Sequence, residues 1–331
     1  MQFQSEQVRV AVKRHNRSIM NNIIDIIKQE LPSLNYKTDE PMKNHTTFKI
    51  GGPVSVMYFP ESMSCLTRLC DILDKHKITP LIIGNGSDLL VSDEALDLVV
   101  ISTLKLNGIS LADTNNVNEP HEYQDIIVEA GTLLSSTAVF AYENGLAGLE
   151  FAHGIPGSLG GAVLMNAGAY NGEMKDVVYS VDAYNPKKGV HTLVGEVNEF
   201  SYRHSRFSKT GDTILSAIIR LKKGDKEGIR QKMEDLSIRR RTSQPLEFPS
   251  GGSTFKRPKE GYAAALIEQA GLKGYTVGGA QVSQKHSGFI INTGNATFKD
   301  TMAVIEHVRE TVLSKFGIEL ELEVKVICGD N

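Results

Sequence analysis

The stretch HGIPGSLGGAVLMNAGAY, residues 153–170, bears more directly on the fold than any other, because glycines at 154, 157, 160 and 161 crowd its first half. Glycine has no Cβ atom, so such a backbone can take positive φ and approach a ligand closely. Pro156 limits how far the loop can flex. A stiff loop without side chains suits a large flat or polyanionic cofactor. Tight turns and close backbone packing explain the same glycines, so both interpretations stay open.

A second glycine-rich stretch, GNGSDLL at 84–90, follows the short apolar run PLII at 80–83. A dinucleotide-binding fingerprint would need a third glycine where Leu89 stands, and no Gly-Lys-Ser/Thr follows for a P-loop. What remains is a tight turn after a strand. Such a turn can direct backbone N–H groups at a phosphate, and a plain loop is the alternative.

The composition is that of a globular protein without a metal or disulfide framework. The chain has 331 residues, which suggests two domains at roughly 150 residues each. The 36 basic and 39 acidic residues give a net charge of −3, so a global basic surface for nucleic acid is absent. Cys65, Cys70 and Cys328 lack metal-ligand spacing and favour a reducing cytosol. No apolar run approaches the roughly 18 residues of a membrane helix, and the N-terminus lacks the apolar segment of a secretory signal.

Short strands and helices alternate between residues 50 and 221, which predicts an α+β fold. Helical spacing of apolar residues indicates helices over 63–73 and 132–144. Turn residues at 185–189 predict a hairpin between their flanking strands. Apolar runs that predict strands lie at 54–59, 80–83, 98–101, 126–130 and 213–221.

The charged run KKGDKEGIRQKMEDLSIRRR, residues 222–241, marks a boundary. Its middle predicts an exposed helix with a solvated face. The part that follows predicts helices over 262–270 and 298–316 and strands over 277–282 and 288–292. The strict alternation of IELELEVKVI, residues 318–327, is typical of a half-buried strand.

Two motifs, one shortly before residue 222 and one after residue 241, could carry chemistry. SYRHSRF (201–207) contains Arg203, and a guanidinium suits carboxylates and phosphates; a polar strand end is the alternative. PSGGSTFKRP (249–258) places Ser253 after two glycines. It is not a hydrolase elbow, which would need glycine at 255, and a serine that caps a loop explains it as well.

Glu323 shares one face of the last predicted strand with Glu319, Glu321 and Lys325. Carboxylates there are more often solvated than catalytic, and spacing does not select one of them. A lone histidine such as His286 is usually structural or exposed.

Taken in order, these pieces resemble one family, the UDP-N-acetylenolpyruvoylglucosamine reductases (MurB). The match spans roughly residues 40–328, and several long motifs in order are far more specific than any single one. The short connection after Leu221 resembles the second, shorter subtype, which lacks an extra substrate-capping loop. The matching segments are NHTTFKIGGP, GNGSDLLVSD, GLEFAHGIPGSLGGAVLMNAGAY, YRHSRF, QPLEFPSGGSTFKRP, AALIEQAGLKGYTVGGAQVS, KHSGFIIN and LELEVKVI.

The resemblance implies an FAD-binding domain of the vanillyl-alcohol-oxidase (PCMH) kind, two-lobed and α+β, over residues 20–222. A smaller α+β substrate-binding domain is implied over residues 223–331. Residues 1–19 have no counterpart in the family and are expected to form a flexible extension. We also expect a monomer in the cytoplasm.

The resemblance implies a two-stage oxidoreductase, a UDP-N-acetylmuramate dehydrogenase. NADPH reduces non-covalently bound FAD, and the reduced flavin reduces UDP-N-acetylglucosamine-enolpyruvate to UDP-N-acetylmuramate. This is a step of peptidoglycan synthesis, and so of cell wall biogenesis, cell shape and cell division. Two other functions are weighed: a flavin oxidase of the same superfamily with another substrate, and a colourless, non-catalytic nucleotide-binding protein. No metal, nucleic acid or membrane insertion is expected.

Site residues are carried over position by position from the family's motifs. Arg203 matches the arginine that stabilises an enolate, Glu323 assists it, and Ser253 matches the proton donor. Help to Ser253 from Lys256 or an ordered water is a hypothesis of our own. The expected substrate-binding residues are Tyr202, Gln244, Lys256 and His286. The expected flavin-binding residues are Gly84, Asn85, Gly86, Ser87, Asp88, Leu89, Gly154, Ile155, Pro156, Gly157, Ser158, Gly160 and Gly161.

Two positions depart from the family pattern. Asn85 and Asp88 stand where the family more often has glycine and asparagine. An inward carboxylate at Asp88 would repel a pyrophosphate. We therefore expect Asp88 to serve through its backbone or to turn its side chain outward.

Overall fold

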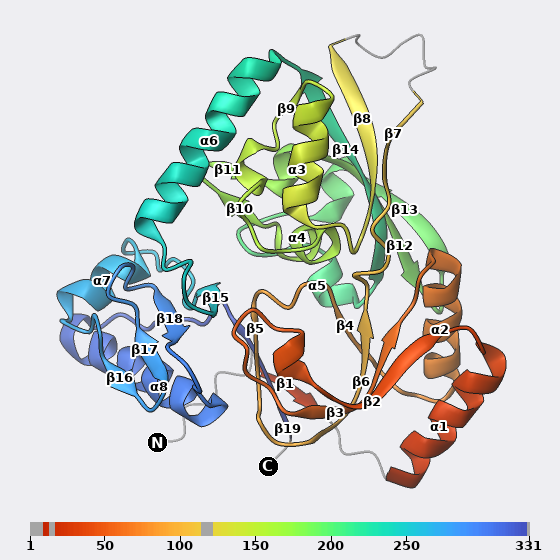
Figure 1. Cartoon of the computed structure of the whole chain (residues 1–331), viewed down its shortest axis with the longest axis horizontal. Helices are drawn as coiled ribbons and strands as arrows, with labels where there is room; N and C mark the ends of the chain where they lie inside the picture. Colours follow the sequence, from red (N-terminus) through yellow and green to blue (C-terminus); the bar gives the residue numbers. More distant parts are fainter. Residues whose placement is uncertain (1–8, 13–16, 114–121, 330–331) are drawn as a thin grey trace.

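The computed structural model describes residues 9–12, 17–113 and 122–329 and arranges them as three groups of helix and sheet (Figure 1). Two groups come from the first two thirds of the chain, and the third comes from its end. Each combines a sheet with helices packed on it, which confirms the α+β class. No helix within these described ranges is long and apolar enough to cross a bilayer.

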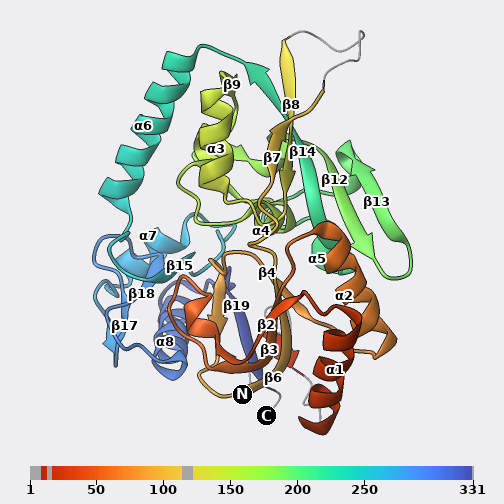
Figure 2. The ribbon, with the colours of Figure 1, turned by 45° about the vertical axis from the view of Figure 1, so that its right-hand side comes forward.

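The first lobe is a mixed four-stranded sheet in the order β2-β3-β6-β4. Strand β3 pairs antiparallel with β2 and parallel with β6, and β4 pairs parallel with β6. The helices α1 and α2 lie side by side on this sheet (Figures 1 and 2). The elements of this lobe are α1 (Arg17–Glu30), β2 (Asn35–Pro41), η1 (Met42–Asn44), β3 (Pro53–Phe59), α2 (Met63–Lys75), β4 (Leu81–Ile83) and β6 (Leu96–Ser102).

The second lobe is an antiparallel sheet in the order β13-β12-β14-β8-β7, and a short strand, β9, also pairs with β14. The predicted hairpin is confirmed, because β12 and β13 pair up to Asn185 and Gly189. Helices α3, α4 and α6 lie on one side of this sheet (Figure 1). The elements are β7 (Ile109–Leu111), β8 (Tyr123–Glu129), α3 (Leu134–Glu143), β9 (Leu146–Ala147), η2 (Glu150–Ala152), α4 (Leu159–Met165), β10 (Gly168–Ala169), β11 (Gly172–Glu173), η3 (Met174–Asp176), β12 (Val178–Asn185), β13 (Gly189–Val194), η4 (Gly195–Asn198), α5 (Phe207–Thr210), β14 (Thr213–Lys223) and α6 (Lys226–Ser243).

The C-terminal group is a small antiparallel sheet, β15-β18-β17-β16, that packs against α7 and α8. Helix α8 has strong local end signals: Thr297 and Asp300 form a capping box, and Gly317 ends the helix with φ +69°. The predicted strand over 277–282 is broken at Gly278, which has φ +54°. The elements are β15 (Ser250–Ser253), α7 (Ala263–Gln269), β16 (Thr276–Val277), β17 (Ala280–Val282), β18 (Phe289–Asn292) and α8 (Phe298–Phe316).

The chain crosses between its first and last parts in both directions. The final strand β19 (Lys325–Gly329) leaves the C-terminal group and pairs parallel with β5 (Leu89–Val91). In return, Phe48, Ile50 and Leu90 lie in the apolar core of the C-terminal group. The division at residues 222 and 223 therefore stays a prediction, because packing and pairing run across it.

Two expectations about the chain ends are corrected. The strand predicted over residues 318–327 is wrong in its first part: the burial of Leu320 and Val324 follows the predicted alternation, but within 318–324 only Leu322 makes a β-bridge, to Phe255, and β19 begins at Lys325. Within the expected extension of residues 1–19, the strand β1 (Arg9–Val12) pairs parallel with β19. The remainder of that expectation, at residues 1–8 and 13–16, lies outside the described residues.

Candidate functional site

The structure brings the two glycine-rich stretches into direct contact. The turn at residues 84–88 runs from β4 to β5 and lies against the loop at residues 153–161. A Cβ atom on Gly84 would lie 1.8 Å from Ser158 Oγ, and Asn85 Nδ2 donates a hydrogen bond of 2.6 Å to the Pro156 carbonyl. The absence of a side chain at Gly84 therefore allows the two stretches to form one surface.

The turn is held equally closely from its other side. Gly86 has φ +58°, and a Cβ atom there would lie 2.1 Å from the His45 carbonyl oxygen. Glycine is required at this position both by its left-handed conformation and by the neighbouring backbone. The sequence pattern suggested a tight turn, and this contact shows what holds it.

Two other glycines in the second loop are not explained by the chain itself. Cβ atoms on Gly157 and Gly161 would meet nothing within the described residues closer than 3.8 Å, and neither residue has positive φ. Gly161 stands in the first turn of α4, where glycine is less favourable than alanine. Space kept open at the cost of helix propensity indicates that a bound group lies there.

Ser158 supplies the matching polar group. Its side chain is buried, and within the described part of the chain its hydroxyl has no hydrogen-bond partner. A buried hydroxyl without a partner is destabilising, so it indicates a partner that a ligand provides. The bare backbone at Gly157 and Gly161 together with this hydroxyl fits the diphosphate of FAD.

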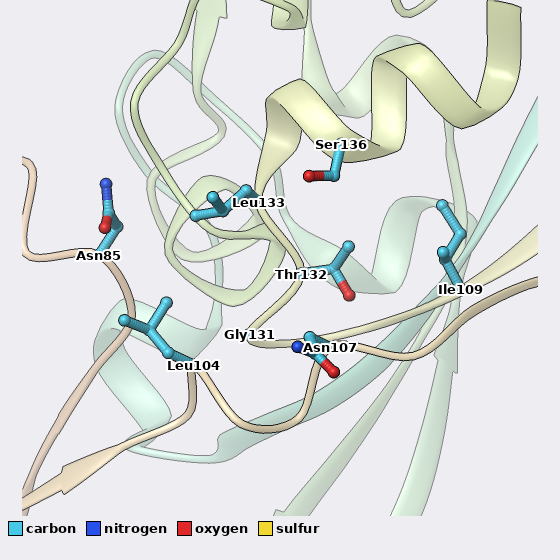
Figure 3. Close-up of a pocket in the computed structure, with 8 residues that line it drawn as sticks. All are labelled: Asn85, Leu104, Asn107, Ile109, Gly131, Thr132, Leu133 and Ser136. Carbon is cyan, nitrogen blue, oxygen red and sulfur yellow. The ribbon is translucent and has the colours of Figure 1, made fainter.

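A pocket of about 310 Å³ opens beside these two stretches (Figure 3). It lies between the turn that carries Asn85 and the start of α3, as Figure 3 shows. Its lining is mostly apolar, with a few amide and hydroxyl groups, as is usual for sites of organic cofactors. The lining residues are Asn85, Leu104, Asn107, Ile109, Gly131, Thr132, Leu133 and Ser136.

Arg203 and Glu323 are brought together from distant parts of the chain. Arg203 Nε donates to Glu323 Oε1 at 2.6 Å, and Arg203 Nη2 lies 3.4 Å from the Gly168 carbonyl. Both side chains are mostly buried. Burial raises the pKa of the Glu323 carboxyl, while the charge and hydrogen bond of Arg203 oppose that rise.

The backbone of Arg203 is itself constrained. Its φ of +52° is uncommon for a residue other than glycine. The backbones of Ser201 and His204 hydrogen-bond to each other on either side of it, at 3.0 and 3.1 Å. This small closed turn aims the guanidinium at Glu323.

Ser253 lies at the end of β15, and it is exposed. The next residue, Thr254, accepts a backbone hydrogen bond of 2.8 Å from the N–H of Glu323. Ser253 is therefore next in sequence to a residue that is bonded directly to the Glu323 backbone. This backbone contact brings Ser253 near the Arg203–Glu323 pair, and the catalytic roles of the three residues stay predictions.

The other predicted substrate residues have varied surroundings. Lys256 Nζ donates to Glu321 at 3.2 Å, which is a different partner from the Ser253 that we hypothesised. The exposed Tyr202 accepts a hydrogen bond at its hydroxyl from the Arg257 N–H. Gln244 directly follows the end of α6.

His286 is engaged in its own turn. Its Nδ1 accepts a hydrogen bond of 3.2 Å from the Gly288 N–H, and its ring packs edge-on against Phe289. Burial lowers the pKa of His286. Burial favours the neutral ring, and the predicted contact of His286 with substrate stays a prediction.

The backbone of Asp88 is bonded to the last strand, and its expected role next to a pyrophosphate stays a prediction. Its carbonyl accepts a hydrogen bond of 2.7 Å from the N–H of Lys325, at the start of β19. The Asp88 charge also contributes to the raised pKa of Glu323, so these two carboxyl groups lie near each other.

Sequence reasoning missed Arg240. The charged run was expected to be a solvated face, yet Arg240 is only 9% exposed, and its Nη1 donates to the Gly154 carbonyl at 2.5 Å. Among the residues that the structure describes, no acidic group forms an ion pair with it. Its position seven residues after the buried Met233 places both on one face of α6, and that spacing was the available indication.

A buried cation without an acidic partner is costly. Arg240 also stacks over Tyr170 at 5.5 Å, and a Cβ atom on Gly154 would lie 2.6 Å from its Nε. The guanidinium therefore packs closely against the second glycine-rich loop, at residues 153–161. This position indicates an anionic ligand next to that loop.

Comparison with known proteins gives similarity over nearly the whole chain. Residues 54–193 match the family described as FAD binding domain, and residues 244–327 match UDP-N-acetylenolpyruvoylglucosamine reductase, C-terminal domain. The protein of that reductase name from Caldanaerobacter subterraneus is 47% identical over 92% of this chain and 98% of its own. The one from Clostridioides difficile is 42% identical over 96% and 100%. The crystal structure of the Thermus caldophilus reductase (MurB) aligns with a TM-score of 0.71 and 32% identity, covering 89% of this chain and 99% of that one.

Replacing Gly161, in the first turn of α4, should have opposite effects on the stability of the protein and on its affinity for FAD. Gly161→Ala should raise the free energy of unfolding of the flavin-free protein by about 0.5–1 kcal/mol, because alanine favours helix. The same methyl group should weaken FAD binding about tenfold or more, the usual scale for one misplaced methyl group in a pocket. Urea unfolding and titration of the flavin-free protein with FAD measure the two effects.

Gly228→Ala is the matched control, since Gly228 holds the same third position of α6, away from both loops. It should leave FAD affinity unchanged, and its gain in stability should be smaller, because a Cβ atom there would lie 3.3 Å from Asp225 Oδ2, which caps α6. Equal FAD affinity in the two variants would contradict a ligand at Gly161.

Proposed function

Because the chain belongs to the UDP-N-acetylenolpyruvoylglucosamine reductase family, we propose that it reduces UDP-N-acetylglucosamine-enolpyruvate to UDP-N-acetylmuramate with electrons from NADPH. It is thus an FAD-dependent oxidoreductase of the CH–CH class in peptidoglycan precursor synthesis. The observation that carries the proposal is the Arg203–Glu323 pair beside Ser253. A flavin oxidase with another substrate would have no need of these three groups together.

FAD is held by residues 84–89 and 154–161, without a covalent bond. Ser158 and the open faces of Gly157 and Gly161 would hold its diphosphate, and the pocket at Asn85 would hold a further part of the cofactor. Arg240 supplies positive charge next to this loop. When bound, FAD would accept a hydride from NADPH and would donate a hydride to the terminal enolpyruvyl carbon.

Arg203 stabilises the negative charge that develops on the substrate's α-carbon and spreads into its carboxylate. A guanidinium whose position is set in advance does so without reorganisation. Glu323 fixes the guanidinium through the 2.6 Å hydrogen bond to Nε, and Nη2 donates to the Gly168 carbonyl at 3.4 Å, so Nη1 is the group that faces the substrate in this proposal. The pair joins the second lobe to the chain's last segment, so the site forms only when both are in place.

Ser253 then gives its proton to the α-carbon. Gly251 and Gly252 precede it, so the hydroxyl is presented on a bare backbone. Tyr202, Gln244, Lys256 and His286 contact the substrate around this point. Lys256 is nearest in sequence and balances charge near Glu323, whose pKa it lowers.

The remaining assignments follow from the chemistry of the ligands. Residues 20–222 bind FAD and residues 223–331 bind the nucleotide-sugar substrate. UDP-sugars and NADPH are cytoplasmic compounds, and the cysteines 65, 70 and 328 are all unpaired, which suits that compartment. The enzyme acts there as a monomer and binds no nucleic acid.

The function is tested with the purified protein under anaerobic conditions. It should be yellow, NADPH should bleach the flavin absorbance, and UDP-N-acetylglucosamine-enolpyruvate should then restore the absorbance. Denaturation should release the flavin into solution. Absorbance that NADPH leaves intact, with oxygen consumed in its absence, would favour the oxidase instead.

Arg203→Lys keeps the charge but loses the planar fork. Reoxidation of the reduced flavin by substrate should slow on the order of a hundredfold, the scale for loss of one preorganised donor. Flavin reduction by NADPH should change little. The control, Arg230→Lys on the exposed face of α6, should alter neither half-reaction. Equal slowing of both halves by Arg203→Lys would point to a structural role.

Ser253→Ala removes the proposed proton donor and adds no charge or bulk. Reoxidation by substrate should slow by about 10²–10⁴-fold, the usual contribution of general acid catalysis, while NADPH still reduces the flavin at the normal rate. Stopped-flow absorbance resolves the two halves. Ser243→Ala, at the exposed end of α6, is the control. A wild-type rate of reoxidation in Ser253→Ala would exclude Ser253 as the donor.

A further inference from the structure

The motif NHTTFKIGGP, residues 44–53, matched the family without receiving a role, and its Thr47 lies between two parts of the site. Thr47 Oγ1 donates a hydrogen bond of 2.7 Å to the Ser250 carbonyl, and it lies 3.3 Å from the Ser87 carbonyl. The Thr47 N–H donates to the Gly86 carbonyl at 3.2 Å. Thr47 therefore contacts both the turn at residues 84–88, called the flavin turn below, and the strand β15 that carries Ser253.

The neighbour of Thr47 anchors it firmly on the side of Ser253. Phe48 is fully buried, and its carbonyl accepts a hydrogen bond of 3.1 Å from Asn292 Nδ2. A Cβ atom on Gly251 would lie 2.6 Å from the Phe48 ring. The glycine thus lets β15 lie directly against Phe48, next to Thr47.

The short strand between Thr47 and Ser253 is poorly fixed by its own sheet. Ser250 and Ser253 pair with β18, but the register shifts between them. Gly252 has φ +76° and no atom of the described chain within 4 Å of where a Cβ would be. Such a stretch can pivot. The hydrogen bond from Thr47 to Ser250 limits that freedom, because it ties the start of β15 to the flavin turn.

We propose that Thr47 is a positioning residue that sets the separation of the flavin turn and Ser253, and so aligns the Ser253 hydroxyl with the substrate α-carbon. The inference rests on the role proposed above for Ser253. It assigns to Thr47 no contact with substrate or flavin. Its effect is exerted through the Ser250 carbonyl.

The test uses the full-length holoenzyme and the two half-reactions. Thr47→Val keeps the branched shape and removes the hydroxyl, and reoxidation by UDP-N-acetylglucosamine-enolpyruvate should slow about tenfold or more, as expected when a reacting group is misplaced by a fraction of an ångström. The rate of flavin reduction by NADPH should stay within about twofold of the wild-type rate. General acid catalysis acts only in the half-reaction in which substrate reoxidises the flavin. The control Thr47→Ser, which restores the hydroxyl, should recover most of the lost rate.

A double-mutant cycle with Ser253→Ala then separates positioning from scaffolding. If Thr47 acts through Ser253, adding Thr47→Val to the Ser253→Ala variant should lower the rate of reoxidation by less than about twofold. The effects of substitutions at residues that act as one unit are not additive. The solvent deuterium isotope effect on reoxidation should also rise in Thr47→Val alone, since proton delivery becomes slower. Melting temperature and flavin content of the variants report on the fold independently of activity.

Three results would overturn the inference. Equal losses from Thr47→Val in both backgrounds would show that Thr47 acts independently of Ser253. Slowing of both half-reactions with a lowered melting temperature would show a purely structural role. Reoxidation of Thr47→Val at the wild-type rate would show that the hydroxyl is unimportant. Failure of the proposed Ser253 role is read separately, from the Ser253→Ala variant alone.

Discussion

The site depends on the absence of side chains where residues 84–88 meet residues 153–161. A Cβ atom at Gly84 would overlap the Ser158 hydroxyl, and one at Gly86 would overlap the His45 carbonyl. The first contact joins the two lobes, and the second holds the turn from within the first part of the chain. The buried Ser158 hydroxyl and the open faces of Gly157 and Gly161 then lie on one small surface, which suits a diphosphate.

The C-terminal part is joined to this surface by exchange of chain segments. Phe48 and Leu90 from the first lobe are buried among C-terminal residues, and β19 pairs with β5 directly after the flavin turn. A site assembled from Arg203, Ser253 and Glu323 needs such an arrangement, because these residues come from different groups of elements. A hinge with few contacts would leave their separation variable, and catalysis is sensitive to displacements of this kind.

The charges of the site are arranged for anionic ligands. Arg203 has one carboxylate partner, and Arg240 is buried with none among the described residues. Glu323 and Asp88 lie close enough for Asp88 to raise the pKa of Glu323. The two guanidiniums are the positive groups on which the proposed binding of FAD and substrate depends. The Asp88 carbonyl is bonded to the Lys325 N–H, so its backbone ties the turn to β19.

Much of the fold is visible in local patterns. The turn at residues 185–189, the helix predicted over 298–316 and the helical spacing of α2 agree with the observed elements, because turn and helix preferences act over a few residues. Where a segment lacks a pairing partner, these patterns fail: residues 318–324 alternate as a strand does, with Leu320 and Val324 on the buried side, yet their pairing is limited to one bridge from Leu322 to Phe255. The identities of Arg203, Ser253 and Glu323 came from resemblance to a family, since their spacing alone left a structural alternative for each.

The sequence by itself determined the α+β class, the two glycine-rich turns and the family to which the catalytic motifs belong. Only the tertiary structure decided that Arg240 is buried against Gly154, that Arg203 takes a left-handed φ, and that Thr47 reaches a carbonyl 203 residues away. The physical reason is the range of the forces involved. Periodicity and turn chemistry are written into neighbouring residues, whereas contacts between distant segments are selected by close packing of the whole chain, which no local spacing records.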